Sequence, residues 1–192
     1  MYTLFISTYD KLINISLLKN GIVIYTLEEI SKQNHSILVM PMINNILKES
    51  NITTKDLNEI IVVNGPGSFT GVRIGVVIAK TLAYTLNIPI KTITSLECLL
   101  VSNNTLTNKL ATIPDTKGKY VGYFNKENEL LEDFKYLKNE EFEKYITGKE
   151  EYLINNDKFH LESIYNYLKN KDSINPHLVN PIYIKGIDVL NG

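Results

Sequence analysis

The chain has 192 residues, of which 44% are apolar and 21% are charged, a composition typical of one folded domain or two small ones rather than of a disordered chain. A formal charge of −1, with Arg73 as the only arginine, provides no basic patch for strong nucleic-acid binding by the chain alone. Cys98 has no second cysteine for an internal disulfide, and no run approaches about 18 continuous apolar residues, so we expect a cytoplasmic protein without a membrane span.

The first 27 residues predict three β-strands in a meander. Residues 2–8, 12–18 and 22–27 are rich in Ile, Leu, Val, Tyr and Thr, which favour strands. Asn20-Gly21 separates the second run from the third, and this pair is a strong signal for a two-residue hairpin.

Residues 35–49 predict a helix that Pro41 either kinks or starts late. Its apolar side chains cover a wide arc, so the helix is expected to be covered on two sides; they are Leu38, Met40, Met42, Ile43, Ile46 and Leu47. His35 opens the helix, and it is interpreted as a surface or capping residue because the only other histidines are far along the chain.

Residues 59–86 are the most informative stretch, since a β-branched run, a glycine-rich bend and a long apolar helical pattern follow one another directly. Gly65 and Gly67 permit backbone angles closed to other residues, and Pro66 ends the strand. Either Ser68 or Thr70 can cap the helix that follows. The pattern predicts a strand, a tight loop and a helix.

One side of this helix is a ridge of small residues at every fourth position, namely Gly71, Gly75, Ala79 and Ala83. Arg73 and Lys80 share a polar arc, and most of the remaining circumference is apolar. A surface helix needs only a narrow apolar stripe, so this helix is expected to be covered by its own sheet and also by a second helix or another protein.

The spacing of the loop does not fit the common nucleotide-binding or nucleophile motifs. Thr70 stands where a P-loop that starts at Gly65 needs glycine, and Gly71 comes one residue late for a dinucleotide fingerprint. A nucleophile elbow at Ser68 needs glycines where Pro66 and Thr70 stand. The loop is therefore expected to be structural, without a cofactor, a metal or a catalytic residue.

The remaining residues predict further strands and then helices. Residues 88–93 read as a strand parallel to the one before the helix, joined by a right-handed crossover. Residues 110–114 and 119–125 read as strands around a turn at 115–118. From Lys126 to Asp172, charged and apolar residues alternate in a way that predicts amphipathic helices.

Residues 65–75, Gly-Pro-Gly-Ser-Phe-Thr-Gly-Val-Arg-Ile-Gly, followed by Ala79-Lys80 and Leu82-Ala83, resemble the signature of the TsaB (YeaZ) family. The resemblance extends over about residues 1–100, and residues 181–185 are similar to the closing segment of many family members. It implies an α/β, actin-like (ribonuclease H-like) fold with a mixed sheet and flanking helices. It also implies an N-terminal lobe over residues 1–100 that carries the loop and the dimerisation helices, and a smaller, divergent lobe over 101–192.

The family resemblance implies a subunit of the machinery that makes threonylcarbamoyladenosine (t6A) beside the anticodon of ANN-reading tRNAs. Ser7 stands where ATP-using relatives carry aspartate, and Ser95 and Leu99 stand where the catalytic paralogue TsaD has metal-binding histidines. The implied role is therefore a non-catalytic scaffold, with a TsaD-like subunit as partner, a TsaE-like ATPase in the full complex, and a homodimer when alone.

Two sets of residues follow from this interpretation. The structural loop comprises Gly65, Pro66, Gly67, Ser68, Thr70 and Arg73. The partner-binding set comprises Leu38, Met42, Ile46, Phe69, Gly71, Val72, Gly75, Val76, Ala79 and Ala83. Two alternatives stay open: a small ATP-binding kinase or ATPase of the same fold, and a lobe in which the two apolar helices only pack on each other.

Overall fold

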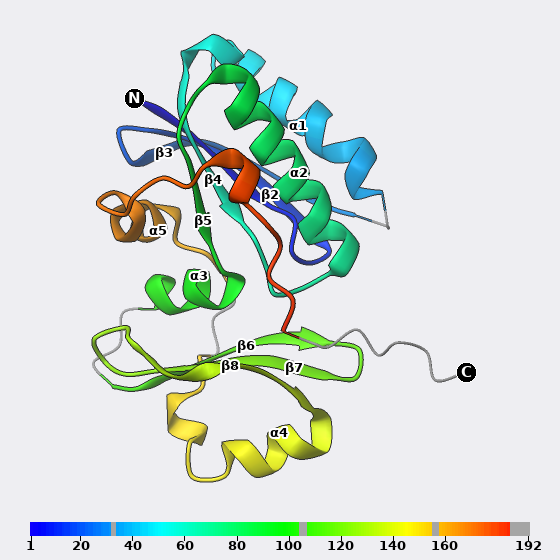
Figure 1. Cartoon of the computed structure of the whole chain (residues 1–192), viewed down its shortest axis with the longest axis vertical. Helices are drawn as coiled ribbons and strands as arrows, with labels where there is room; N and C mark the ends of the chain where they lie inside the picture. The colour runs from blue at the N-terminus through cyan, green and yellow to red at the C-terminus, as the bar shows by residue number, and fades with distance from the viewer. Residues whose placement is uncertain (32–33, 104–106, 155–157, 185–192) are drawn as a thin grey trace.

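The computed structural model describes residues 1–31, 34–103, 107–154 and 158–184, and Figure 1 shows their arrangement. A five-stranded mixed sheet contains β1 (Tyr2–Ser7), β2 (Leu12–Lys19), β3 (Ile22–Ile30), β4 (Leu57–Val63) and β5 (Ile90–Ile93), in the order β3-β2-β1-β4-β5. The first three strands are antiparallel neighbours, and β4 pairs in parallel with both β1 and β5. The predicted meander and the predicted parallel pair are both confirmed.

The hairpin between β2 and β3 turns at Asn20 and Gly21, whose φ angles are 53° and 82°. Two successive residues with positive φ are the geometry that the Asn-Gly pair favours, and this geometry matches the twist of the two strands. The sequence signal and the observed turn agree.

Helices α1 (His35–Glu49) and α2 (Phe69–Leu86) lie side by side on the large sheet (Figure 1). Helix α1 continues through Pro41 without interruption. Helix α2 has the length and mean hydropathy of a membrane span, but its buried residues pack on the sheet as those of a core helix do. Most of the large core lies between these helices and strands β1, β2 and β4.

A smaller antiparallel sheet contains β6 (Lys109–Asp115), β7 (Gly118–Phe124) and β8 (Leu130–Lys138), in that order. Helix α3 (Ser95–Ser102) packs on β6 and β7 and joins this sheet to the main core. Helix α4 (Asn139–Ile146) packs on β7 and β8 and closes a separate small core of Leu110, Val121 and Phe142. The single-turn 3₁₀ segments are Thr54–Asp56, Glu150–Tyr152 and Pro176–Leu178.

Strand β8 corrects the prediction that residues 126–172 form only helices. Asn125 and Asn128 form the turn that leads into it: Asn128 has φ +68°, and the amide of Asn125 donates to the carbonyl of Glu129. Phe134 and Tyr136, two residues apart, then reach the main core, as alternate residues of a strand do. The helix prediction is confirmed for α4 and for α5 (Leu161–Leu168).

After α5 the chain returns to the large sheet. Ile174 forms an isolated bridge with Ile90, and residues 174–184, which we call the C-terminal strap, then run beside α2 (Figure 1). The chain thus crosses between the two sheets more than once, and a division into lobes at residue 100 stays a prediction.

Candidate partner-binding face beside the glycine-rich loop

The glycine-rich loop connects the carboxyl end of β4 to the first turn of α2. Ser68 is the N-cap residue: its hydroxyl accepts from the amide of Gly71 at 3.2 Å. The amide of Ser68 itself donates to the carbonyl of Tyr9 at 2.6 Å. Of the two predicted caps, the structure therefore selects Ser68, and the hydroxyl of Ser68 stabilises the start of the helix.

Two other segments of the chain hold the loop from outside. The hydroxyl of Ser95 donates to the carbonyl of Pro66 at 2.6 Å, and the amide of Ser95 donates to the carbonyl of Gly65 at 2.9 Å. The amide of Ile182, in the C-terminal strap, donates to the carbonyl of Asn64 at 2.8 Å. Ser95 thus positions the loop.

The small residues of α2 face inward. A Cβ atom at Gly71 would lie 2.2 Å from the carbonyl oxygen of Thr8, and one at Gly75 would lie 2.2 Å from the Thr8 hydroxyl oxygen. That hydroxyl donates to the carbonyl of Gly71 at 2.8 Å. Gly71 and Gly75 therefore permit the close approach of Thr8, the residue after β1, which is contact within the chain.

This geometry changes which residues can touch a partner. Eight of the ten residues predicted to bind one lie buried in the core and expose almost no surface: Met42, Ile46, Gly71, Val72, Gly75, Val76, Ala79 and Ala83. The physical reason is that the most apolar arc of each helix packs on its own sheet. Leu38 is half-buried, and Phe69 is exposed.

The outward side of the same two helices is also apolar. We call it the outer face: exposed Ile37 and Met40 on α1, exposed Phe69, Val77 and Tyr84 on α2, and half-buried Leu38, Ile74, Ile78 and Leu82. Val77 is 57% exposed and Ile37 is 68% exposed. Ile37, Val77 and Tyr84 are not among the residues predicted to bind a partner, although the spacing of Phe69, Arg73 and Val77 marks one line of the helix opposite the small residues.

The C-terminal strap borders α2 along its length. Lys80 Nζ donates to the carbonyls of Val179 at 3.0 Å and His177 at 3.4 Å, and the rings of Tyr84 and His177 meet edge to face with centroids 4.8 Å apart. Lys80 therefore attaches the strap to the helix, although the sequence pattern indicated only a polar arc.

Arg73 lies where the strap, the loop and the outer face meet. Its guanidinium carbon is 4.0 Å from the centroid of the Phe69 ring, and its Nε donates to the Tyr183 hydroxyl at 2.8 Å. The Phe69 and Tyr183 rings are themselves 5.2 Å apart. Arg73 was predicted as part of the structural loop, and the structure places its side chain on the surface, over the exposed Phe69 ring and hydrogen-bonded to the hydroxyl of the exposed Tyr183.

The three histidines lie apart from one another. His35 is buried, with Nε2 2.8 Å from the carbonyl of Asp10 and Nδ1 3.0 Å from the Ser31 hydroxyl. It therefore joins the start of α1 to the β1–β2 turn, and the surface prediction for it is wrong because both ring nitrogens are used inside the fold. Within the described ranges, no three His, Cys, Asp or Glu side chains are grouped so that they could hold a metal ion.

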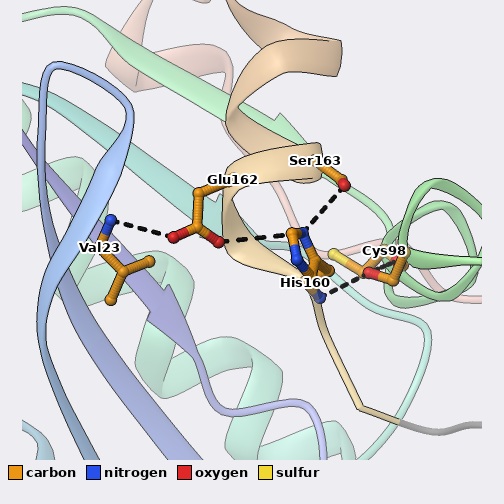
Figure 2. A network of polar contacts seen from close by, with 6 residues as sticks. Val23, Cys98, His160, Glu162 and Ser163 are labelled. Atoms are coloured by element: carbon orange, nitrogen blue, oxygen red, sulfur yellow. Dashed lines mark hydrogen bonds and ion pairs between the residues drawn. The ribbon is translucent and has the colours of Figure 1, made fainter.

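A polar network near α5 has the residue types of a hydrolase site but not the geometry. Figure 2 shows Glu162 and Ser163 directed at the ring of His160, and both contact Nδ1, at 3.8 Å and 3.0 Å. A catalytic triad needs the serine and the carboxylate on opposite ring nitrogens. The network instead joins α5 to β3, where Glu162 accepts from the amide of Val23 at 3.2 Å, and to α3.

Cys98, in the same view, is fully buried. Burial raises the pKa of its thiol well above the usual range, and the charge of Glu97 raises the pKa further. Since the thiolate is the reactive form, Cys98 is a packing residue of α3.

Comparisons with known proteins place this geometry among its relatives. The family model described as tRNA N6-adenosine threonylcarbamoyltransferase (TsaD) matches residues 23–156. The tRNA threonylcarbamoyladenosine biosynthesis protein TsaB of Bacillus subtilis is 40% identical over 134 residues, which are 69% of this chain and 58% of that protein. TsaB of Buchnera aphidicola subsp. Schizaphis graminum is 47% identical over 77 residues, 40% of this chain and 37% of that protein.

The solved structure of YeaZ from Pseudomonas aeruginosa has the same fold, with a TM-score of 0.76 at 19% identity over 95% of this chain and 99% of that one. The predicted α/β fold with a mixed sheet and a second, smaller sheet is confirmed. The chain spans a little over half the length of the Bacillus subtilis relative.

Proposed function

Since the chain belongs to the TsaB (YeaZ) group of the family that the tRNA N6-adenosine threonylcarbamoyltransferase model describes, we propose that it is a non-catalytic partner-binding subunit in t6A biosynthesis. Its partner is a TsaD-like transferase subunit that modifies the adenosine beside the anticodon. The outer face of α1 and α2 is the surface that binds this partner.

The observation that carries this proposal is the outer face itself. The two helices already bury one apolar arc on the sheet, and they still expose Ile37, Phe69, Val77 and Tyr84 to solvent. Large apolar residues gathered on one exposed surface are typical of a protein–protein interface. Burial of several such side chains contributes about 1.5–3 kcal/mol each, which can offset the large cost of association.

The residues at the catalytic positions of relatives support a role without catalysis. Ser7 is buried at the end of β1 and has no carboxylate with which to hold a divalent cation. The Ser95 hydroxyl already donates to the carbonyl of Pro66 in the loop, and buried Leu99 has no donor atom for a metal. The alternative of a small ATP-using enzyme is not favoured, since the curated relatives above are named for t6A biosynthesis.

The proposal extends to the setting of the protein. The subunit acts in the cytoplasm, it meets a TsaE-like ATPase in the full complex, and it forms a homodimer through the outer face when the TsaD-like partner is absent. The single cysteine supports the cytoplasmic location. The apolar outer face, which would otherwise be exposed to solvent, supports the homodimer.

The test is a charge placed on the outer face. Val77→Asp and Ile37→Asp are expected to weaken binding to the TsaD-like subunit of the same organism by about 3 kcal/mol or more, over 100-fold, because each buries an unpaired carboxylate in the interface. The measurement is titration calorimetry, with the melting temperature of each variant as the check of folding. Val76 and Met42 are unsuitable positions, since a charge there would lie in the core.

The matched control is Leu131→Asp, because Leu131 is 46% exposed on β8 of the smaller sheet, away from the outer face. This variant is expected to bind as the unaltered chain does. Wild-type affinity in both outer-face variants, or equal loss in the control, contradicts the proposed interface.

A further inference from the structure

Arg73 is held in a defined position at the edge of the outer face. The guanidinium carbon lies over the Phe69 ring, 4.0 Å from its centroid, and the hydrogen bond from Nε to Tyr183 uses the donor that lies nearest the aliphatic stem. The two terminal nitrogens, Nη1 and Nη2, are the pair that forms a fork with two parallel N–H bonds. The contacts with Phe69 and Tyr183 thus leave the two terminal nitrogens available to a partner.

No carboxylate pairs with this fork within the described ranges, where the ion pairs of the chain all involve lysine or histidine. The segments that form and border the outer face are also poor in acid. Helices α1 and α2 and the C-terminal strap together contain Lys48, Arg73 and Lys80 against Glu49 alone, a formal charge of +2 in a chain whose total is −1. These three segments are therefore net positive, whereas the rest of the chain is net negative.

We propose that Arg73 is the polar anchor of the outer face and that it binds an aspartate or glutamate side chain on the TsaD-like partner. This inference rests on the proposed function and names the chemistry that the partner must supply. The required partner surface is apolar, with one carboxylate placed at its edge to receive the Arg73 fork. Arginine and aromatic residues together are the composition typical of interface hot spots.

A second copy of the chain is a poorer occupant of this face. Self-pairing would bring together two copies of segments whose formal charge is +2, and the only carboxylate on these three segments, Glu49, ends α1 at its far end from the loop. An acidic partner supplies the carboxylate that a second copy lacks on these segments. Charge complementarity of this kind favours the TsaD-like partner over a second copy. The homodimer is accordingly the weaker of the two complexes.

The experiment compares Arg73→Met, Arg73→Lys and Lys48→Met in calorimetric titrations with the TsaD-like subunit at two salt concentrations. Arg73→Met retains an unbranched apolar stem over Phe69 and is expected to weaken binding by about 30-fold or more. Arg73→Lys retains the charge but loses the fork, and is expected to recover only part of the affinity. Lys48→Met, the control of equal charge change on α1, is expected to stay within about threefold.

Three outcomes overturn the inference. The first is wild-type affinity for Arg73→Met when Val77→Asp abolishes binding, because the interface would then be held by apolar contacts alone. If neither variant changes the affinity, the proposed function fails. The second is an equal loss of affinity for the partner in Asp188→Asn, because the carboxylate that Arg73 needs would then belong to this chain. Asp188 lies outside the described residues. The third is an Arg73→Met variant that loses affinity for tRNA instead of for the partner.

Discussion

At the scale of single residues, Gly71 and Gly75 in the first two turns of α2 are required because neighbouring atoms leave no room for a side chain, and not because the backbone needs flexibility. Both have ordinary helical backbone, where alanine is normally more favourable by about 1 kcal/mol. The carbonyl of Thr8 lies where a methyl group on Gly71 would be, and the Thr8 hydroxyl lies where one on Gly75 would be. The position of β1 therefore reverses the usual preference for alanine.

Gly71→Ala is accordingly expected to lower the free energy of unfolding by about 1–3 kcal/mol, because the new methyl group meets backbone that can move only as a unit. Urea unfolding followed by circular dichroism measures this change. Thr81→Ala, at an exposed position of the same helix, is the control and is expected to stay within about 0.5 kcal/mol. A Gly71→Ala protein more stable than the original would show that helix propensity outweighs the contact.

At the scale of elements, a buried ion pair attaches α5 to the edge of the large sheet. Lys91 on β5 lies 3.0 Å from Glu59 on β4, and both side chains are almost fully buried. Lys91 Nζ also donates to the carbonyls of Leu168 at 3.0 Å and Lys169 at 3.3 Å, at the end of α5. One ammonium group thus satisfies a carboxylate from the sheet and the terminal carbonyls of a helix.

Lys91→Met is expected to destabilise the protein by about 3–5 kcal/mol, because it leaves the carboxylate of Glu59 buried with only the Thr3 hydroxyl, at 3.4 Å, as donor. Thermal unfolding by calorimetry checks this value. Lys126→Met, which removes the exposed pair with Glu127, provides the comparison and is expected to change stability by less than about 1 kcal/mol. Equal effects of the two substitutions would contradict the structural role of the buried pair.

At the scale of the whole molecule, α3 holds the two sheets together. It packs on β6 and β7 on one side and on α5 on the other, and its first residue also clamps the glycine-rich loop. The C-terminal strap makes a second connection, from Ile174 beside β5 to Tyr183 beside Arg73. The outer face therefore belongs to a unit that residues from both halves of the chain hold together.

Cys98 on α3 provides a probe of this junction. Because the thiol is fully buried and its pKa is raised by burial, the native protein at pH 8 is expected to react with a thiol reagent only after unfolding. The labelling rate should then rise with urea in parallel with global unfolding, with the fully denatured chain as the reference. Rapid labelling without denaturant would instead indicate that the two sheets separate in the native state.

The sequence by itself determined the features that depend on neighbours along the chain. The Asn20-Gly21 hairpin and the succession of β4, loop and α2 are local, because turn conformations and helix starts depend on a few adjacent residues. A cap at Ser68 or Thr70 was also visible, and the structure decided for Ser68. The signature of residues 65–75 is equally local, and it identified the family. The apolar arcs of α1 and α2 were also visible.

Only the tertiary structure decided which of those apolar residues are left for a partner. A periodic pattern shows that a helix has more than one apolar side, but the sheet covers whichever side permits the closest approach, here the small residues of α2 that meet Thr8. The Arg73–Tyr183 contact joins residues 110 positions apart, a separation that no local pattern encodes. The partner-binding face therefore depended on packing between distant segments, whereas the loop beside it depended on its own sequence.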